Sequence, residues 1–150
     1  MPIVNNGGET KRITPAEMGI NAMAGNAGDG ANDGNWIDIR GYNQIALFVR
    51  FVASGDATSA AMTFNIEVSD DGGTNGYYLQ TESKAWGVVT LSQRQYSSAT
   101  NNADHNFAVD FPCNSPYFRI RDVAVATGHA NDTIYVSAIL GRGGWLGAVP

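Results

Sequence analysis

Apolar and polar residues alternate along several stretches of the chain after residue 36, and a period of two is typical of β-strands. The clearest stretch is 62–69, in which every second residue is apolar: Met62, Phe64, Ile66 and Val68. The pattern predicts a strand with these side chains facing a core. It places the alternate polar side chains in water: Thr63, Asn65, Glu67 and Ser69.

The stretch 45–52 carries apolar residues on both of its predicted faces, which is typical of a central strand. Gly and Asp residues in 70–76 predict turns, so 62–80 is interpreted as a hairpin. Further strands are predicted at 36–40, 86–92, 106–111, 117–126 and 133–140. About seven or eight short strands without a strong helical period predict an all-β, antiparallel β-sandwich, and strand number and loop lengths favour a jelly roll.

Residues 1–35 lack this alternation and are expected to form an extended, irregular N-terminal arm followed by a loop. The segment 25–35 contains mainly Gly, Asn, Asp and Ala, which favour turns and flexible chain. One short helix is predicted at Thr14–Glu17, because Thr14 and Glu17 have the spacing of a capping box and Pro15 suits the first helical position. The sequence therefore divides into the arm, a sandwich domain at 36–142 and a tail at 143–150.

Composition narrows the possible functions. The chain has 150 residues, enough for one core, and a net charge of −5 with scattered arginines, so we expect no nucleic-acid partner. No apolar run is long enough for a membrane helix, and the start lacks the pattern of a secretory leader. Cys113 is the single cysteine, which excludes an intramolecular disulfide and favours a buried thiol.

Residues capable of catalysis or metal binding show no specific pattern. His105 and His129 lie in polar segments without the paired spacing of a zinc site, and no two carboxylates can be nominated as an acid and base pair. The Asp and Asn residues in 29–35 and 70–75 offer oxygen ligands for calcium, but turns select the same residue types. We therefore expect no catalytic residue, no metal and no cofactor.

Both ends of the chain carry apolar side chains in polar or glycine-rich surroundings. These residues either cover the sandwich of their own subunit or bind a partner, and the sequence leaves both alternatives open. The candidate partner-binding residues are Ile3, Val4, Ile13, Met18, Ile20, Met23, Trp145 and Leu146.

Two segments, Ile66-Glu67-Val68-Ser69-Asp70-Asp71-Gly72-Gly73-Thr74 and Pro116-Tyr117-Phe118-Arg119-Ile120-Arg121, each read as a strand with its turn. In these segments and in its acidic, Gly- and Ala-rich composition, the chain resembles virion proteins of tailed bacteriophages, especially the jelly-roll decoration or cement proteins of their heads.

The resemblance implies a non-enzymatic protein on the outer capsid surface that bridges major capsid subunits and stabilises the head. It also implies a homo-oligomer, with a trimer favoured over a dimer, and an arm that reaches between capsid subunits. Two alternatives stay open. One is a carbohydrate-binding, lectin-like sandwich in which exposed aromatic side chains stack on sugars, and the other is a tail or receptor-binding module.

Overall fold

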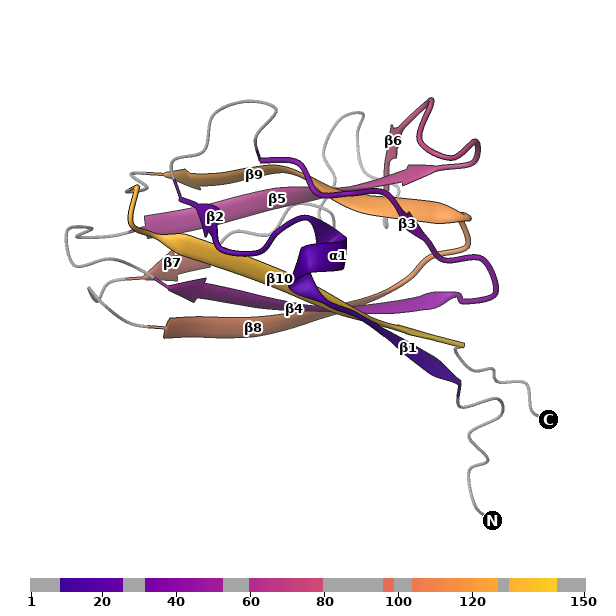
Figure 1. Cartoon of the computed structure of the whole chain (residues 1–150), viewed down its shortest axis with the longest axis horizontal. Helices are drawn as coiled ribbons and strands as arrows, with labels where there is room; N and C mark the ends of the chain where they lie inside the picture. Colours follow the sequence, from indigo (N-terminus) through magenta and orange to yellow (C-terminus); the bar gives the residue numbers. More distant parts are fainter. Residues whose placement is uncertain are drawn as a thin grey trace, which may run out of the picture.

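The computed structural model of the chain describes residues 9–25, 32–52, 60–79, 96–98, 104–126 and 130–142. These residues form two antiparallel sheets packed face to face, as Figure 1 shows. The first sheet contains β1 (Thr10–Ile13), β2 (Met23–Ala24), β4 (Gln44–Val52), β8 (Asp104–Pro112) and β10 (Thr133–Gly141). The second contains β3 (Ile37–Asp38), β5 (Ala60–Ser69), β6 (Tyr77–Tyr78), β7 (Tyr96–Ser98) and β9 (Tyr117–Ala126).

The strands pair in a nested order. β1 pairs with β10, β3 with β9, β4 with β8, and β5 with both β6 and β7. These are the pairs of one long hairpin that has been rolled up so that successive pairs lie in opposite sheets. This arrangement is a jelly roll, and the predicted antiparallel β-sandwich is therefore confirmed.

The core lies between the two sheets and consists of the alternate residues that the strand pattern predicted. On β4 they are Ile45, Leu47, Val49 and Phe51, and on β10 they are Ile134, Val136, Ala138 and Leu140. Across the sandwich, the Phe111 and Phe118 rings meet edge to face with centroids 6.5 Å apart. Each fully buried side chain of this size stabilises the fold by about 1.5–3 kcal/mol.

The N-terminal segment differs from the expected irregular arm. Residues 9–25 contain β1, the helix α1 (Pro15–Met18) and β2, and both strands pair with β10. The physical reason is burial, since Ile13, Met18 and Ile20 are at most 3% exposed and belong to the core of the sandwich. The short helix itself is confirmed, and Thr14 and Glu17 make the predicted capping box.

The polar segment before β3 is also packed against the sandwich. Asn32 and Gly34 are buried, the Gly34 N–H donates to the Ile120 carbonyl, and the Asn32 amide donates to the Val123 carbonyl. Residues 32–35 therefore belong to the domain and not to a flexible loop. The hairpin at 62–80 is confirmed by the pairing of β5 with β6, whereas the strand predicted at 86–92 lies outside the described residues.

Cys113 follows β8 and is 2% exposed, as predicted for a structural thiol. Burial raises the pKa of its thiol. Among the described residues, no helix has the length and apolarity that crossing a membrane requires.

Candidate functional site

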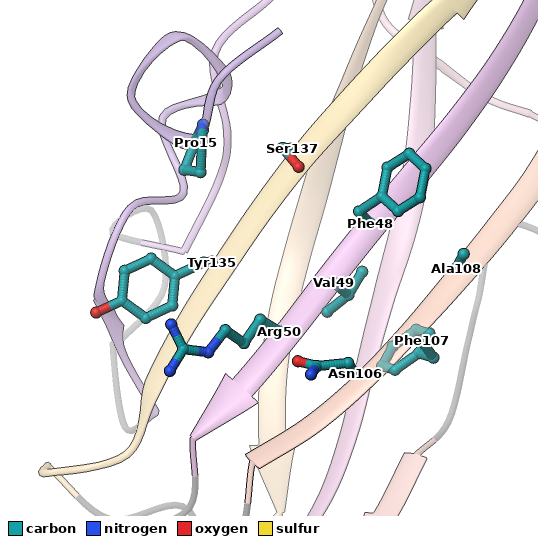
Figure 2. A pocket seen from close by; sticks show the side chains of 9 residues that line it. All are labelled: Pro15, Phe48, Val49, Arg50, Asn106, Phe107, Ala108, Tyr135 and Ser137. Carbon is teal, nitrogen blue, oxygen red and sulfur yellow. The ribbon is translucent and has the colours of Figure 1, made fainter. Parts of the chain in front are cut away.

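An open groove lies on the outer face of the first sheet, the face turned away from the core (Figure 2). It has a volume of about 560 Å³, a size typical of small-molecule sites. Strands β4, β8 and β10 form its floor and the start of α1 contributes to its side. The residues that line it are Pro15, Phe48, Val49, Arg50, Asn106, Phe107, Ala108, Tyr135 and Ser137.

Strand register arranges the outward-facing side chains of the groove in two neighbouring rows. Phe48 is paired with Ser137 of β10 and with Ala108 of β8. Two residues further along β4, Arg50 is paired with Tyr135 and with Asn106. Because a strand rises about 3.3 Å per residue, the mainly apolar first row and the polar second row lie roughly 7 Å apart.

The side of the groove depends on an insertion in the edge strand. Met23 lies ten positions after Ile13, whereas their partners Ile134 and Ala138 lie only four positions apart on β10. The six additional residues leave the edge and form α1, which brings Pro15 to the groove. The Ile20 carbonyl accepts the Val136 N–H, so the segment stays attached to β10 between β1 and β2.

Arg50 is the only formally charged residue among the nine that line the groove. Its guanidinium carbon lies 5.5 Å from the centroid of the Tyr135 ring, a distance at which cation–π attraction holds the two side chains together. Beside this pair, Phe48 leaves 43% of its surface exposed, which is unusual for a phenylalanine on a paired central strand. The groove therefore combines one positive charge, an exposed aromatic ring and neutral hydrogen-bonding groups.

A second polar cluster lies on the outer face of the other sheet, around Glu67. Its carboxylate accepts a hydrogen bond from Arg119 Nε at 2.5 Å and another from Arg121 Nη1 at 2.8 Å. The prediction that Glu67 faces water was wrong, because the residue is only 3% exposed. It points away from the core as the alternation requires, but the turn before β6 and the two arginines cover it.

Aromatic side chains and two further carboxylates complete this cluster. Trp36 stacks on Arg119 at 4.7 Å, and Tyr78 lies 6.0 Å from Arg121. Asp122 accepts hydrogen bonds from the Tyr78 hydroxyl at 2.8 Å and from the Asn65 amide at 3.0 Å. The bond to Asp122 is the main reason that the pKa of Tyr78 is raised.

The backbone of β9 is adapted to hold this cluster. Asp122 has a φ of 54° at an irregularity in the β5 and β9 pairing, and its N–H donates to Asp33 Oδ1. Arg121 Nε is buried without a hydrogen bond and lies 3.7 Å from Asp33 Oδ2 and 3.6 Å from Asp122 Oδ1. The cluster joins the segment before β3 to β5, β6 and β9, and its charges are satisfied within the protein, so we assign it a structural role.

The two acidic loops considered for calcium have different outcomes. In the first loop, Asp29 lies outside the described residues, whereas Asp33 accepts the Asp122 N–H. In the second loop, Asp71 is bound within its own turn. Asp71 accepts hydrogen bonds from the Asn75 N–H and the Ser69 hydroxyl, and these lower its pKa to about 2. In the described part of the chain, no three His, Cys, Asp or Glu residues are placed to hold a metal ion together.

The structure divides the eight predicted partner-binding residues into two groups. Ile13, Met18 and Ile20 lie in the core of their own subunit, and Met23 packs against it half-buried, so self-packing is the alternative observed for these four. A partner reaches the first three only if the segment leaves β10. The other four lie outside the described residues: Ile3, Val4, Trp145 and Leu146.

Sequence reasoning missed the groove, although one signal pointed toward it. The apolar residues on both faces of 45–52 indicated a central strand, which β4 is, but Phe48 lies on the solvent side and remains exposed. Tyr135 and Asn106 join Arg50 only through strand register, which the pattern of a single strand does not give.

Comparison with models of known protein families and with curated proteins gave no match for this chain. Function is therefore argued from the fold, the surface and the residues themselves.

Proposed function

We propose that this protein is a non-enzymatic structural component of a bacteriophage virion that binds the outer capsid surface and bridges major capsid subunits. The resemblance of its sequence to head decoration proteins suggested this role, and the jelly-roll sandwich is the fold that the resemblance implied. In this proposal the protein acts as a homo-oligomer, most simply a trimer on a local symmetry axis of the capsid.

The observation that carries the proposal is the position of the two ends of the domain. Thr10, at the start of β1, is paired with Gly141, at the end of β10. Paired strands lie about 4.8 Å apart, so the chain enters and leaves the sandwich at one point of one sheet edge. Ile3 and Val4 precede this point by a few residues and Trp145 and Leu146 follow it closely.

This common point gives the protein a defined attachment side. Tryptophan is among the residue types that contribute most to protein interfaces, and two apolar segments that bind the same partner offer more buried area than either alone. Binding fixes interface side chains at a cost in conformational entropy, and several copies in one oligomer offset that cost through avidity. The sandwich then acts as the rigid body that holds the attached subunits together.

Cosedimentation with capsids that lack the protein tests this proposal. One variant lacks residues 1–8 and a second carries Trp145→Ala with Leu146→Ala, so that β1 and the core residues of 13–20 stay intact in both. We expect both variants to bind at least tenfold more weakly than the full chain. Tyr77→Ala is the matched control, because Tyr77 is 57% exposed on β6 and far along the chain from both ends.

Light scattering of the purified chain measures the oligomer, and heating of saturated capsids measures the stabilisation. Unchanged capsid binding by both end variants, with unchanged thermal unfolding of the sandwich, would contradict the attachment model. If the purified protein is a monomer and does not bind capsids, the proposed function is wrong.

A further inference from the structure

Two large apolar side chains remain exposed next to each other on the outer face of the first sheet. Phe48 of β4 is 43% exposed and Ile139 of β10 is 38% exposed. Ile139 is paired with Ala46, two residues before Phe48, so the two large side chains are diagonal neighbours roughly 7–8 Å apart. Contiguous exposed apolar side chains on a protein surface mark interaction sites, whereas single ones do not. This face is therefore a candidate contact surface.

One row of side chains on this face ends in opposite charges. Strand register aligns four residues across the whole sheet: Arg12 on β1, Ile139 on β10, Ala46 on β4 and Asp110 on β8. Arg12 and Asp110 are exposed, and within the described ranges neither forms an ion pair. Three strand spacings, about 14 Å in total, keep them too far apart to pair within one copy. The row thus presents a positive edge, an apolar middle and a negative edge.

A second copy of the chain presents the complementary pattern. A two-fold axis that runs parallel to the strands, between β10 and β4, places β1 of one copy opposite β8 of the other. Arg12 of each copy then lies opposite Asp110 of the other, which gives two ion pairs between the copies. A two-fold axis across the strands would instead place Arg12 opposite Arg12 and Asp110 opposite Asp110, and like charges in contact are unfavourable. The charge pattern therefore favours the axis parallel to the strands.

The same axis also brings large side chains opposite small ones. Ile139 of one copy lies opposite Ala46 of the other, and Phe48 lies opposite Ser137, because each of these pairs is a register pair of β10 and β4. Figure 2 shows Phe48 and Ser137 on these two neighbouring strands. Large and small side chains that alternate across facing positions let two sheets pack closely, about 10 Å apart. Size and charge thus select the same arrangement.

The face has the area that a dimer of modest stability needs. β4, β8 and β10 have nine residues each. Nine residues extend over about 30 Å and four strands over about 19 Å, so two such faces in contact bury roughly 1,100 Å² in total, near the lower limit for a specific interface. The start of α1 rises beside β10, and under this axis it lies opposite Ala108 of the other copy, whose short side chain leaves it room.

We propose that the outer face of the first sheet binds the same face of a second copy, with Arg12 of each copy on Asp110 of the other and Phe48 on Ser137. Such a contact closes at two copies and gives a dimer, whereas the trimer of the proposed function rests on the resemblance alone. The contact does not depend on capsid binding. Because the axis runs along the strands, the paired ends at Thr10 and Gly141 lie at the same end of both copies, so a dimer turns both attachment sides to one surface.

Sedimentation velocity of the full chain between about 5 and 500 µM measures the equilibrium between monomer and dimer. We expect the full chain to dimerise. Arg12→Glu and Asp110→Arg should each weaken dimerisation at least tenfold, because each places like charges opposite each other. An equimolar mixture of these two variants should form dimers again, since every changed charge then lies opposite a charge of the other sign. Phe48→Ala should also weaken dimerisation at least tenfold.

Lys11→Glu is the matched control, because it reverses a charge beside Arg12 on the same strand but on the other face of the sheet. Thermal unfolding of each variant establishes that it is folded. The inference is overturned if the full chain stays monomeric or forms a trimer, if Arg12→Glu and Lys11→Glu have equal effects, or if the mixture stays monomeric. A dimer that does not bind capsids would support this contact and contradict the proposed function, and a trimer that binds them would do the reverse.

Discussion

At the scale of single residues, Glu67 shows how a charge is kept inside this protein. Gly76 lies directly over the carboxylate, and a Cβ atom at Gly76 would come within 1.9 Å of Glu67 Oε1. Water is excluded by this contact, so the two arginines replace it as hydrogen-bond donors. Removing the negative charge takes away the one carboxylate that hydrogen-bonds both arginines. Only the longer contacts of Arg119 and Arg121 to Asp33 and of Arg121 to Asp122 then remain.

We therefore predict that Glu67→Gln lowers the free energy of unfolding by about 3 kcal/mol, the lower end of the range for breaking a buried ion pair, since both arginines are partly exposed. Denaturant unfolding measures the change. Asp38→Asn is the matched control, because the pair of Asp38 with Arg40 is exposed and its loss should cost clearly less than loss of the buried pair. If Glu67→Gln and the unchanged protein have equal stability, the prediction is wrong and solvent replaces the ion pairs of Glu67 with the two arginines.

Asp71 makes the stability of the turn at 70–75 dependent on pH. Its pKa is lowered to about 2 from the ordinary 3.8, first by the Asn75 N–H and then by the Ser69 hydroxyl, so the folded state prefers the charged carboxylate. The resulting stability is complete above the unfolded pKa and is lost as pH falls from about 4 to 2. We predict that Asp71→Asn is less stable than the unchanged protein at pH 6 and that the difference disappears near pH 2.

Denaturant unfolding of both proteins at intervals of pH gives this difference directly. Asp38 also has a pKa near 2, because the Arg40 side chain and N–H bind it, so the unchanged protein alone does not isolate Asp71. A difference that stays constant between pH 6 and pH 2 would contradict the assignment.

The burial of Glu67 could not be predicted from the sequence pattern around it. Alternation along 62–69 places Glu67 correctly on the outer face, and Phe64, Ile66 and Val68 correctly inside. Whether an outer face is exposed to solvent depends on what covers it. Here Glu67 is covered by the turn at Gly76 and by Arg119 and Arg121, which lie more than fifty positions away. The sequence neighbours of Glu67 are apolar strand residues, and they give no indication of those partners.

At the scale of elements, α1 depends on the sandwich for its stability. Four residues are too few for an isolated helix, and the capping box satisfies only its first turn. Its last residue, Met18, is fully buried, and the next residue, Gly19, has a φ of 75° and lies against Asn35. The helix is thus fixed by packing at its end and by one glycine whose conformation other residues rarely adopt.

We predict that Met18→Ala lowers the free energy of unfolding by about 3 kcal/mol, within the range for truncating a fully buried side chain. Met23→Ala is the control, because Met23 is half-buried at the edge of the same core and should cost clearly less. Chemical denaturation compares the two. If both variants lose the same stability, α1 is not packed as described.

The elements that the sequence predicts correctly are those whose pattern lies within their own residues. β5 and β10 follow a period of two, and the capping box of α1 is contained in Thr14 and Glu17. The N-terminal segment was expected to be irregular because its three core residues are separated by polar chain and a six-residue insertion. Only pairing with β10, at the other end of the sequence, brings them into one sheet edge.

At the scale of the whole molecule, the nested topology distributes each half of the chain over both sheets. The first sheet contains β1 and β10, and the second contains β3 and β9, so neither sheet is made from one continuous part of the sequence. Thr10 and Gly141, which pair with each other, come from opposite ends of the described chain. Folds dominated by such distant pairs fold slowly, in about milliseconds to seconds, and have few parts that open alone.

Cys113 offers a probe of this cooperativity. It is buried in the shared core between β8 and β9, which lie in opposite sheets, and its N–H donates to the Asn43 carbonyl at 3.0 Å. Burial also raises the pKa of the thiol, so the reactive thiolate is disfavoured while the protein is folded. We predict that a thiol reagent modifies Cys113 only through global unfolding, with the same dependence on denaturant as unfolding followed by tryptophan fluorescence.

The control is Cys113→Ser with Asn114→Cys, which places a thiol at an exposed position beside residue 113 and should react at once. Faster labelling of Cys113 with a weaker dependence on denaturant would show instead that the connection between β8 and β9 opens while the rest of the jelly roll stays folded.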